Sequence, residues 1–250
     1  MGRCVLDVAS RDPRFEVVAA LTRSDDKSCH SVIHFGDNQS CLTDRLVVPC
    51  DVLIDFTVGS GTLAWLSVCE AQRIPMIIGA TGHHEPASQR IRQAATALPI
   101  VQAGNFSTGI SAIVGFLAKL SEQLGDSYDV EIVETHHRHK ADAPSGTAWS
   151  LADEILAAKG RTRADVIHGR QGQTGERPKG PIAIHSVRMG DVVGQHEIHF
   201  SAPGETLTIR HMAHSREVFA VGALRAAAWV IGRPPGLYCM GDVIASPEPV

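Results

Sequence analysis

Short apolar runs alternate with helical stretches through the first hundred residues. Four runs are rich in β-branched residues and show little polar alternation, at 15–21, 51–56, 76–78 and 99–101. Such runs are typical of strands buried on both faces of a parallel sheet. Helical patterns lie between the later runs, over roughly 62–71 and 86–97. The alternation of strand and helix predicts a doubly wound α/β layer.

The pattern changes after a helix expected over 108–124. A strand expected at 130–134 leads into a basic segment, and a polar, glycine-rich loop is expected over 164–180. Three later runs resemble antiparallel strands, at 182–187, 192–200 and 206–211. An apolar helix over 218–231 follows. We therefore predict two domains, with a boundary near Ser107 and a C-terminal return to the first domain.

The basic segment 136–140 carries the clearest chemistry, because it holds three imidazoles, a guanidinium and an ammonium group. Burying so many ionisable groups without partners is costly, so the segment is either solvated surface or the floor of an anion-binding cleft. Ser145 has the pattern of a helix N-cap, and the backbone N–H groups of Gly146 and Thr147 would add donors for a carboxylate. This favours a cleft for a small substrate with two acid groups.

Composition narrows the function classes. The formal net charge of −4 over 250 residues gives no electrostatic reason to expect nucleic acid or an anionic membrane as a partner. Neither an apolar stretch of membrane-spanning length nor a signal-peptide pattern is apparent. The six cysteines are scattered without a CxxC pair, which indicates reduced thiols. We expect a cytoplasmic protein.

Polar or glycine-containing turns follow three of the predicted strands. Thr57 follows the second, residues 79–82 follow the third, and residues 103–107 follow the fourth. Ligands of open α/β sheets bind at the carboxyl ends of the strands. These turns are therefore candidates for holding a cofactor.

The residues at these places resemble one known family along essentially the whole chain. The motif His136–Lys140 with Asp142–Ala148 is the specific part, and shorter matching segments occur in order at Ile54–Thr57, Gly79–Gly82, Asn105–Ser107, Thr174–Arg177, Val187–Asp191 and Ser215–Arg216. Together they resemble the dihydrodipicolinate reductase family of diaminopimelate and lysine biosynthesis. The dinucleotide turns alone would be weak evidence.

The resemblance implies a fold and an activity. The fold is an α/β protein with a Rossmann-like parallel sheet in a nucleotide domain, over 1–107 with a return at 217–250. A smaller α/β substrate domain with a mixed or antiparallel sheet covers 108–216. The activity is the NAD(P)H-dependent reduction of 4-hydroxy-tetrahydrodipicolinate, a small dicarboxylate, to tetrahydrodipicolinate, and the assembly is a homotetramer.

The resemblance also implies site residues. His136 matches the catalytic histidine and Lys140 the lysine that donates a proton. The positions that hold the substrate carboxylates are His137, Gly146 and Thr147. The positions that contact the cofactor are Gly79, Ala80 and Thr81 in one turn, and Ala103, Gly104, Asn105 and Phe106 in the loop near the nicotinamide.

The chemistry of the residues agrees with this reaction. Reduction of a cyclic conjugated imine needs a hydride, which NADPH or NADH supplies because no side chain can, and an acid that protonates the product. Lysine and histidine can serve as that acid if neighbouring cations lower the pKa of the lysine toward neutrality. Two substrate carboxylates explain why the segment is so basic.

Two places depart from the family pattern. The family often has an acidic residue before an arginine at the ribose site, whereas Thr22 precedes Arg23 here. Arg23 then becomes a cofactor-binding candidate that pairs with the phosphate of NADPH, which we expect to be used at least as well as NADH. The family also begins with a strand and a glycine-rich turn, while residues 3–10 already have the pattern of the helix that follows them. We expect the cell to make a chain longer by roughly 12–20 residues that supply this strand and turn.

Two other functions compete with the reductase. One is a relic or interaction protein of the same fold that has lost cofactor binding. The other is a metal hydrolase built on His136 and His139, which have helix-like spacing, although Arg138 and Lys140 between and beside them argue against a metal site, so none is expected there. His139 is expected to be structural, and Thr174–Arg177 is expected to be a loop near the site without a catalytic role. The joint presence of His136, Lys140, Gly146 and Thr147 favours the active reductase.

Overall fold

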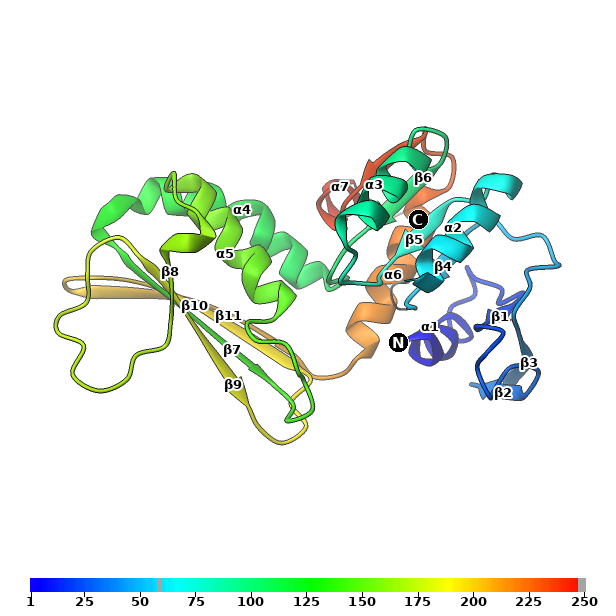
Figure 1. Ribbon diagram of the computed structural model, residues 1–250, viewed down its shortest axis with the longest axis horizontal. Coiled ribbons are helices and arrows are strands. Elements are labelled where there is room, and N and C mark those ends of the chain that lie inside the picture. Colours follow the sequence, from blue (N-terminus) through cyan, green and yellow to red (C-terminus); the bar gives the residue numbers. More distant parts are fainter. Residues whose placement is uncertain (58–59, 247–250) are drawn as a thin grey trace. The chain divides into compact units, whose positions relative to one another are not determined.

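The computed structural model describes residues 1–57 and 60–246. The chain divides into two compact units. The first unit combines Met1–Thr108 with Arg216–Val250, so it is built from both ends of the chain, and the second unit is the continuous segment Gly109–Ser215 (Figure 1).

The first unit contains a four-stranded parallel sheet in the order β12-β6-β5-β4. Its strands are β4 (Leu53–Asp55), β5 (Met76–Ile78), β6 (Pro99–Gln102) and β12 (Gly236–Tyr238). Its helices are α1 (Gly2–Ala9), α2 (Ser60–Gln72), α3 (Glu85–Ala94), α6 (Glu217–Val230) and α7 (Met240–Ala245). The expected strands at 51–56, 76–78 and 99–101 are thus confirmed, as are the helices expected between them.

Helices cover both faces of this sheet, because successive side chains of a strand point to opposite faces. On the central strand β5, Met76 and Ile78 pack in one cluster with residues of α2 and α3, such as Leu66 and Ile91. Ile77 packs in another cluster with α6 and α7. All three β5 residues are fully buried, which is why this run is apolar without alternation.

The first unit also holds a separate three-stranded sheet in the order β1-β3-β2, which the sequence did not predict. Its strands are β1 (Ala20–Leu21), β2 (Val32–Phe35) and β3 (Asn38–Thr43). β2 and β3 form an antiparallel hairpin, and β1 pairs with β3 in parallel. The expected strand 15–21 was too long, because regular pairing involves only Ala20 and Leu21. β2 alternates in burial but has only four residues, and β3 is largely polar, so neither gives a pattern long enough to recognise.

A cavity of about 620 Å³ lies within the first unit. It is lined by parts of α1, of the segment 14–21, of β4 and of α6. Among the described residues, β1 pairs with β3 alone and β4 with β5 alone, so the two strands do not join across the cavity. Residues 15–19 therefore have no neighbouring strand to pair with, which explains why the predicted strand is cut short.

The second unit contains one five-stranded sheet in the order β11-β10-β7-β9-β8. Its strands are β7 (Asp129–His136), β8 (Val166–His168), β9 (Ile182–Arg188), β10 (Gly194–Ala202) and β11 (Glu205–Ala213). The helices α4 (Thr108–Leu124) and α5 (Gly146–Ala158) pack on it, as Figure 1 shows, with Leu117 and Leu151 fully buried against Ile132 and Ile198. Two short 3₁₀ turns complete it, η1 (Gly125–Ser127) and η2 (Arg163–Asp165).

Two expectations for this sheet were wrong. β9 is parallel to β7 and to β8, not antiparallel, because the chain crosses over through α5 between β7 and β8 and through the loop 169–181 between β8 and β9. β8 lies inside the segment expected to be a loop, and its three residues are too few to give a recognisable pattern. The antiparallel pairing expected for the other two runs is confirmed by β10 and β11.

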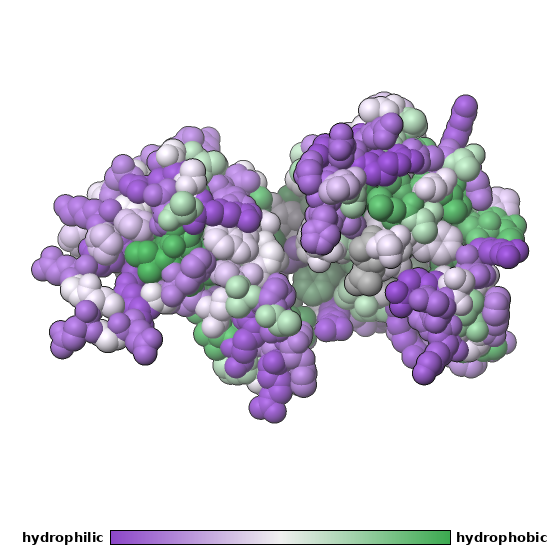
Figure 2. Space-filling model, in the orientation of Figure 1, coloured by the Kyte–Doolittle hydropathy of each residue, from purple (hydrophilic) through white to green (hydrophobic). Residues whose placement is uncertain are grey.

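Within the described residues, no helix combines the length and the apolar character that crossing a membrane requires. The face shown in Figure 2 is largely hydrophilic, with smaller apolar areas on both units. All six cysteines are free thiols, and Cys69 is the fully buried one.

Candidate active site

The predicted catalytic and substrate-binding residues lie around the end of β7 and the start of α5, in the second unit. His136 is the last residue of β7. His137 and Lys140 follow in a turn, in which the Lys140 N–H donates to the His137 carbonyl at 3.1 Å. Gly146 and Thr147 open α5. A single segment thus carries all five residues from a strand end to a helix start.

A buried carboxylate joins the strand end to the helix start. Glu134 lies two residues before His136 on β7, so both side chains are on the same face of the sheet. The Glu134 side chain is completely buried, and its Oε2 lies 2.5 Å from His136 Nδ1. Its Oε1 accepts a hydrogen bond of 3.2 Å from the Ser145 N–H, just before α5. Glu134 therefore fixes the imidazole and the helix entry at once.

Arg188 on β9 balances the charge of this carboxylate. Its Nη1 and Nη2 donate to Oε2 and Oε1 of Glu134 at 2.9 and 2.8 Å, in a two-pronged ion pair. Burial alone would raise the pKa of Glu134, but the hydrogen bonds from His136 and Arg188 outweigh it and hold that pKa well below its usual range. Glu134 is thus a carboxylate anion in the folded protein.

The pairing with Glu134 also sets the role of each His136 nitrogen. Nδ1 faces a carboxylate, so it carries a hydrogen and donates it. Nε2 lies near Gly194 on β10, where an added Cβ would stand 3.2 Å away from it. A larger residue at position 194 would press on the imidazole. The glycine therefore leaves room for His136 to keep its orientation.

A second histidine beneath the helix start is neutral. His196 on β10 is 3% exposed, and its Nε2 lies 3.1 Å from the Ser145 hydroxyl. Its ring meets that of His136 edge to face, with 5.2 Å between centroids. Burial lowers the pKa of His196 to about 3, and the nearby His136 adds to the effect. Ser145 is also the N-cap of α5, as predicted, since its Oγ accepts from the Ala148 N–H at 3.1 Å.

Lys140 is held by a charged neighbour, Asp142. Its Nζ lies 2.9 Å from Asp142 Oδ1, and its side chain is 22% exposed. Partial burial would raise the pKa of Asp142, but the hydrogen bond and charge of Lys140 lower it overall. Arg188 also donates to the Asp142 carbonyl at 2.6 Å, which ties this loop to the Glu134 ion pair.

The helix start leaves space for a ligand. Gly146 is exposed, and a Cβ added there would meet nothing within 4 Å. Thr147 is half-buried beside it. The N-terminus of a helix presents backbone N–H groups and partial positive charge, which together suit an anion.

The two predicted cofactor turns are neighbours in the first unit, because β5 and β6 pair in parallel and end at the same edge. A Cβ added at Gly104 would stand 3.9 Å from Thr81 Cγ2, so the two turns approach each other. A Cβ at Gly79 would lie only 2.2 Å from the Phe56 ring, so this position requires glycine. Ala80 and Phe106 are buried, whereas Gly104 in the loop after β6 is exposed.

The loop after β6 is held from behind by α6. A Cβ added at Gly222 would lie 1.7 Å from the Phe106 carbonyl oxygen, closer than any two such atoms can stand. Within the same loop, the Ser107 N–H donates to Asn105 Oδ1 at 2.8 Å. The loop and the helix therefore pack backbone against backbone.

Arg23 is not grouped with these turns. It is exposed, follows β1 in the three-stranded sheet, and its Nε lies 3.5 Å from Asp25 Oδ1. Asp55, at the end of β4, is buried and accepts hydrogen bonds from the Thr57 N–H and the Thr62 hydroxyl, which is a structural task. Arg177 bonds Asp129 and Glu131 at the end of β7 away from His136, so the expectation that this loop lies near the site was wrong for Arg177.

Sequence reasoning missed Glu134, Arg188 and His196. The signal for Glu134 was present, because a charged residue in an apolar strand two positions before a predicted catalytic histidine shares its face. Arg188 and His196 come from β9 and β10, and their proximity depends on the register of the sheet, which no local pattern reveals.

Comparison with known proteins matches one family along nearly the whole chain. Residues 1–106 match the family described as dihydrodipicolinate reductase, N-terminus, and residues 109–244 match its C-terminus. A 4-hydroxy-tetrahydrodipicolinate reductase of Psychrobacter arcticus is 38% identical over 98% of this chain and 91% of its own, and one of Thiobacillus denitrificans is 41% identical over 98% and 94%.

A solved structure shares the fold. It is a dipicolinate-bound dihydrodipicolinate reductase from Paenisporosarcina sp. TG-14, with a TM-score of 0.75 and 24% identity over 96% of this chain and 94% of that one. The sequence matches reach from the first residue almost to the last and span both units. The chain belongs to the dihydrodipicolinate reductase family.

Proposed function

We propose that this protein is an NAD(P)H-dependent oxidoreductase that reduces 4-hydroxy-tetrahydrodipicolinate to tetrahydrodipicolinate in diaminopimelate and lysine biosynthesis. The observation that carries the proposal is the identity of 38% and 41%, over 98% of the chain, to two relatives that bear the name of this activity. The arrangement of the second unit supports it, because the residues that the reaction needs stand on one connected segment.

His137, Gly146 and Thr147 bind the two substrate carboxylates in this proposal. The imidazole of His137 and the N-terminal N–H groups of α5 are donors that suit anions. Thr147 adds a hydroxyl, and Gly146 leaves the approach open. These groups act by binding, so their loss should raise KM more than it lowers kcat.

Lys140 and His136 carry the proton transfer. Lys140 is the proton donor, and Asp142 holds its ammonium group in place before substrate enters. Glu134 acts through His136 as a positioning residue, since its carboxylate fixes the ring and Arg188 fixes the carboxylate.

The cofactor fits the two turns of the first unit. The close approach of Gly104 to Thr81 brings the two turns together at one sheet edge, where ligands of parallel sheets bind. Gly79, Ala80 and Thr81 would hold the cofactor on one side, and Ala103, Gly104, Asn105 and Phe106 on the other. When bound, NADPH or NADH supplies the hydride.

We further propose that Arg23 makes NADPH at least as good a cofactor as NADH. Its guanidinium is exposed and can pair with a phosphate. Arg23→Ala should lower kcat/KM for NADPH and leave that for NADH nearly unchanged. A wild-type kcat/KM clearly higher for NADH would refute this preference.

The assembly and the compartment are also proposals. The family resemblance supports a homotetramer, which light scattering of the purified protein would test. Six free thiols suit a reducing compartment such as the cytoplasm.

The decisive experiment measures NAD(P)H consumption with the cyclic substrate generated enzymatically in the same cuvette. We expect consumption that depends on substrate and that chelators leave unchanged. Dinucleotide binding without turnover would overturn the substrate assignment, and failure to bind either dinucleotide would favour the relic. A hydrolytic activity that needs no dinucleotide and is lost with a chelator would favour the metal hydrolase.

Glu134→Gln tests the positioning role. The amide keeps the size of the side chain but cannot accept hydrogen bonds at both ends, so we expect a lower kcat and a changed pH profile of kcat with little change in KM. Glu131→Gln, at the opposite end of β7, is the matched control that should keep the wild-type pH profile. If the pH profile of kcat is the same for Glu134→Gln and the wild type, Glu134 has no positioning role.

A further inference from the structure

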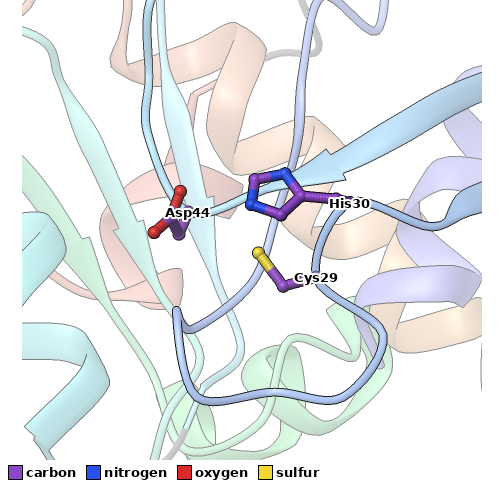
Figure 3. A group of neighbouring side chains, drawn as sticks. All are labelled: Cys29, His30 and Asp44. Atoms are coloured by element: carbon purple, nitrogen blue, oxygen red, sulfur yellow. The ribbon is translucent and has the colours of Figure 1, made fainter.

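Three metal-binding side chains gather in the first unit, on the three-stranded sheet. Cys29 and His30 lie between β1 and β2, and Asp44 directly follows β3. One ligand atom of each residue, the thiol sulfur, a ring nitrogen and a carboxylate oxygen, lies within 4.8 Å of the other two. Figure 3 shows the three groups facing one another from two separate stretches of chain.

An unusual backbone conformation brings the two adjacent residues to the same side. His30 has φ of +68°, which is uncommon for a residue other than glycine and carries a conformational cost. Hydrogen bonds hold it there: the His30 N–H donates to the Leu42 carbonyl at 2.7 Å, and the Leu42 N–H donates to the Ser31 carbonyl at 2.9 Å. In extended chain, neighbouring side chains would point to opposite faces, so this turn is what lets both face Asp44.

The three side chains have no other task in the fold. Throughout residues 1–57 and 60–246, none of them makes a side-chain hydrogen bond or an ion pair. A nearby carboxylate differs, because Asp26 accepts bonds from the N–H and the hydroxyl of Ser28 at 2.8 and 2.5 Å. Asp44 is thus left available beside the thiol and the imidazole.

The donor set selects one class of ion. Magnesium and calcium take oxygen ligands, and this group offers a single carboxylate. Sulfur, nitrogen and oxygen donors together suit zinc, whose ligand atoms in a tetrahedral site lie roughly 3–4 Å apart. The observed separation of up to 4.8 Å is slightly wider than that range. His30 is exposed, so solvent reaches the group and water can complete the coordination.

We propose that Cys29, His30 and Asp44 bind one zinc ion, with water as the fourth ligand. The ion ties the segment after β1 to the end of β3. This part of the chain has little hydrophobic core to stabilise it. From residue 10 to residue 52 the buried apolar side chains are those of Ala20 and Phe35. β1 and β3 share only two register pairs. Since a metal that binds the folded form stabilises it, the ion secures a sheet with little core of its own.

Cobalt(II) titration of the purified full-length protein tests the proposal, because a thiolate ligand gives cobalt a charge-transfer absorption that oxygen and nitrogen ligands do not. We expect one equivalent of cobalt to develop this band and one equivalent of zinc to abolish it. Cys29→Ser should remove the band, and Asp44→Asn should weaken zinc binding on the order of 100-fold. Cys41→Ser is the matched control, since Cys41 is an exposed thiol on the adjacent β3 and should leave the band unchanged.

Thermal unfolding with and without zinc chloride gives a second readout that does not depend on activity. Zinc should raise the Tm of the wild type and of Cys41→Ser, and leave that of Cys29→Ser unchanged. A wild type without the thiolate band overturns the proposal, as does a band that survives in Cys29→Ser. Circular dichroism of Cys29→Ser shows whether that variant is folded, and if it is not, Asp44→Asn decides by the same titration.

Discussion

The sheet of the second unit runs without interruption from β11 to β8, whereas the strands of the first unit fall into two separate sheets. In the second unit the fully buried side chains of β7, β9, β10, α4 and α5 form one cluster. In the first unit a cavity of about 620 Å³ is lined by strands of both sheets. The second unit thus has one continuous core, whereas the core of the first unit contains a cavity.

The difference matches the kind of chemistry that each unit holds. The buried Glu134 is tolerable only where Arg188 and His136 stand at hydrogen-bonding distance, and such geometry requires strands in fixed register. The cofactor turns of the first unit depend less on strand register, because they offer backbone groups at one sheet edge. A precise charged site therefore occurs in the unit with the continuous sheet.

The largest expected effect separates catalysis from cofactor binding. Lys140→Ala should lower kcat roughly 10²–10⁴-fold, the usual contribution of a general acid. It should leave the Kd of NADPH unchanged, because the cofactor turns belong to the other unit. Steady-state kinetics and fluorescence titration measure the two quantities. Lys179→Ala, at an exposed lysine of the same unit, is the control, and wild-type turnover by Lys140→Ala would contradict the mechanism.

Two matched truncations compare the cores directly. Leu151→Ala on α5 removes a fully buried side chain and should lower the free energy of unfolding by about 2–5 kcal/mol. Leu224→Ala on α6 removes the same atoms beside the cavity and should cost less, because fewer partner atoms surround them. Urea unfolding measures both. A larger loss for Leu224→Ala would show that the cavity is filled in solution.

Acid should weaken the second unit through His196. Its ordinary pKa is 6.5 and its pKa in the folded protein is about 3, so between these values the unfolded chain binds a proton that the folded chain does not. This contribution to the free energy of unfolding is therefore fully present above pH 6.5 and is lost as the pH is lowered. The loss is on the order of 2 kcal/mol between pH 6.5 and pH 4.5.

The histidine contribution can be isolated in that window. Glu131, whose pKa is about 2, titrates mainly below it: burial would raise that pKa, and bonds from Arg170, His185 and Arg177 lower it. His196→Gln should flatten the dependence of the free energy of unfolding on pH, measured in urea at several pH values. An unchanged slope would mean that His196 is protonated in the fold.

The smallest expected effect comes from filling the cavity. Ala228→Leu on α6 adds apolar atoms where the side chain already lines the space, and should raise the unfolding midpoint of the first unit by the equivalent of about 0.5–2 kcal/mol. Ala157→Leu on α5 adds the same atoms at an exposed position and should change nothing. Differential scanning calorimetry compares them, and a lower midpoint for Ala228→Leu would indicate that the space is already occupied.

Local patterns predicted much of this molecule. The buried strands of the parallel sheet, the N-cap at Ser145 and the basic segment at 136–140 each carry their signal within a few residues. The direction of β9 did not, because it depends on a crossover. The Glu134–Arg188 ion pair joins residues 54 positions apart, so only the assembled register brings them together.

The sequence did not predict the β2–β3 hairpin or the group around His30, for a different reason. In the hairpin, β2 is too short and β3 is too polar to show a hydrophobic period. The positive φ of His30 is set by bonds to Leu42, and a histidine gives no warning of it as a glycine would.

The contact between Gly222 and the Phe106 carbonyl has a consequence for synthesis on the ribosome. The loop after β6 acquires its final wall only when α6 emerges, and Gly109–Ser215 must be translated in between. At roughly 5–20 residues per second this takes several seconds. The inserted unit can therefore fold before the first unit is complete.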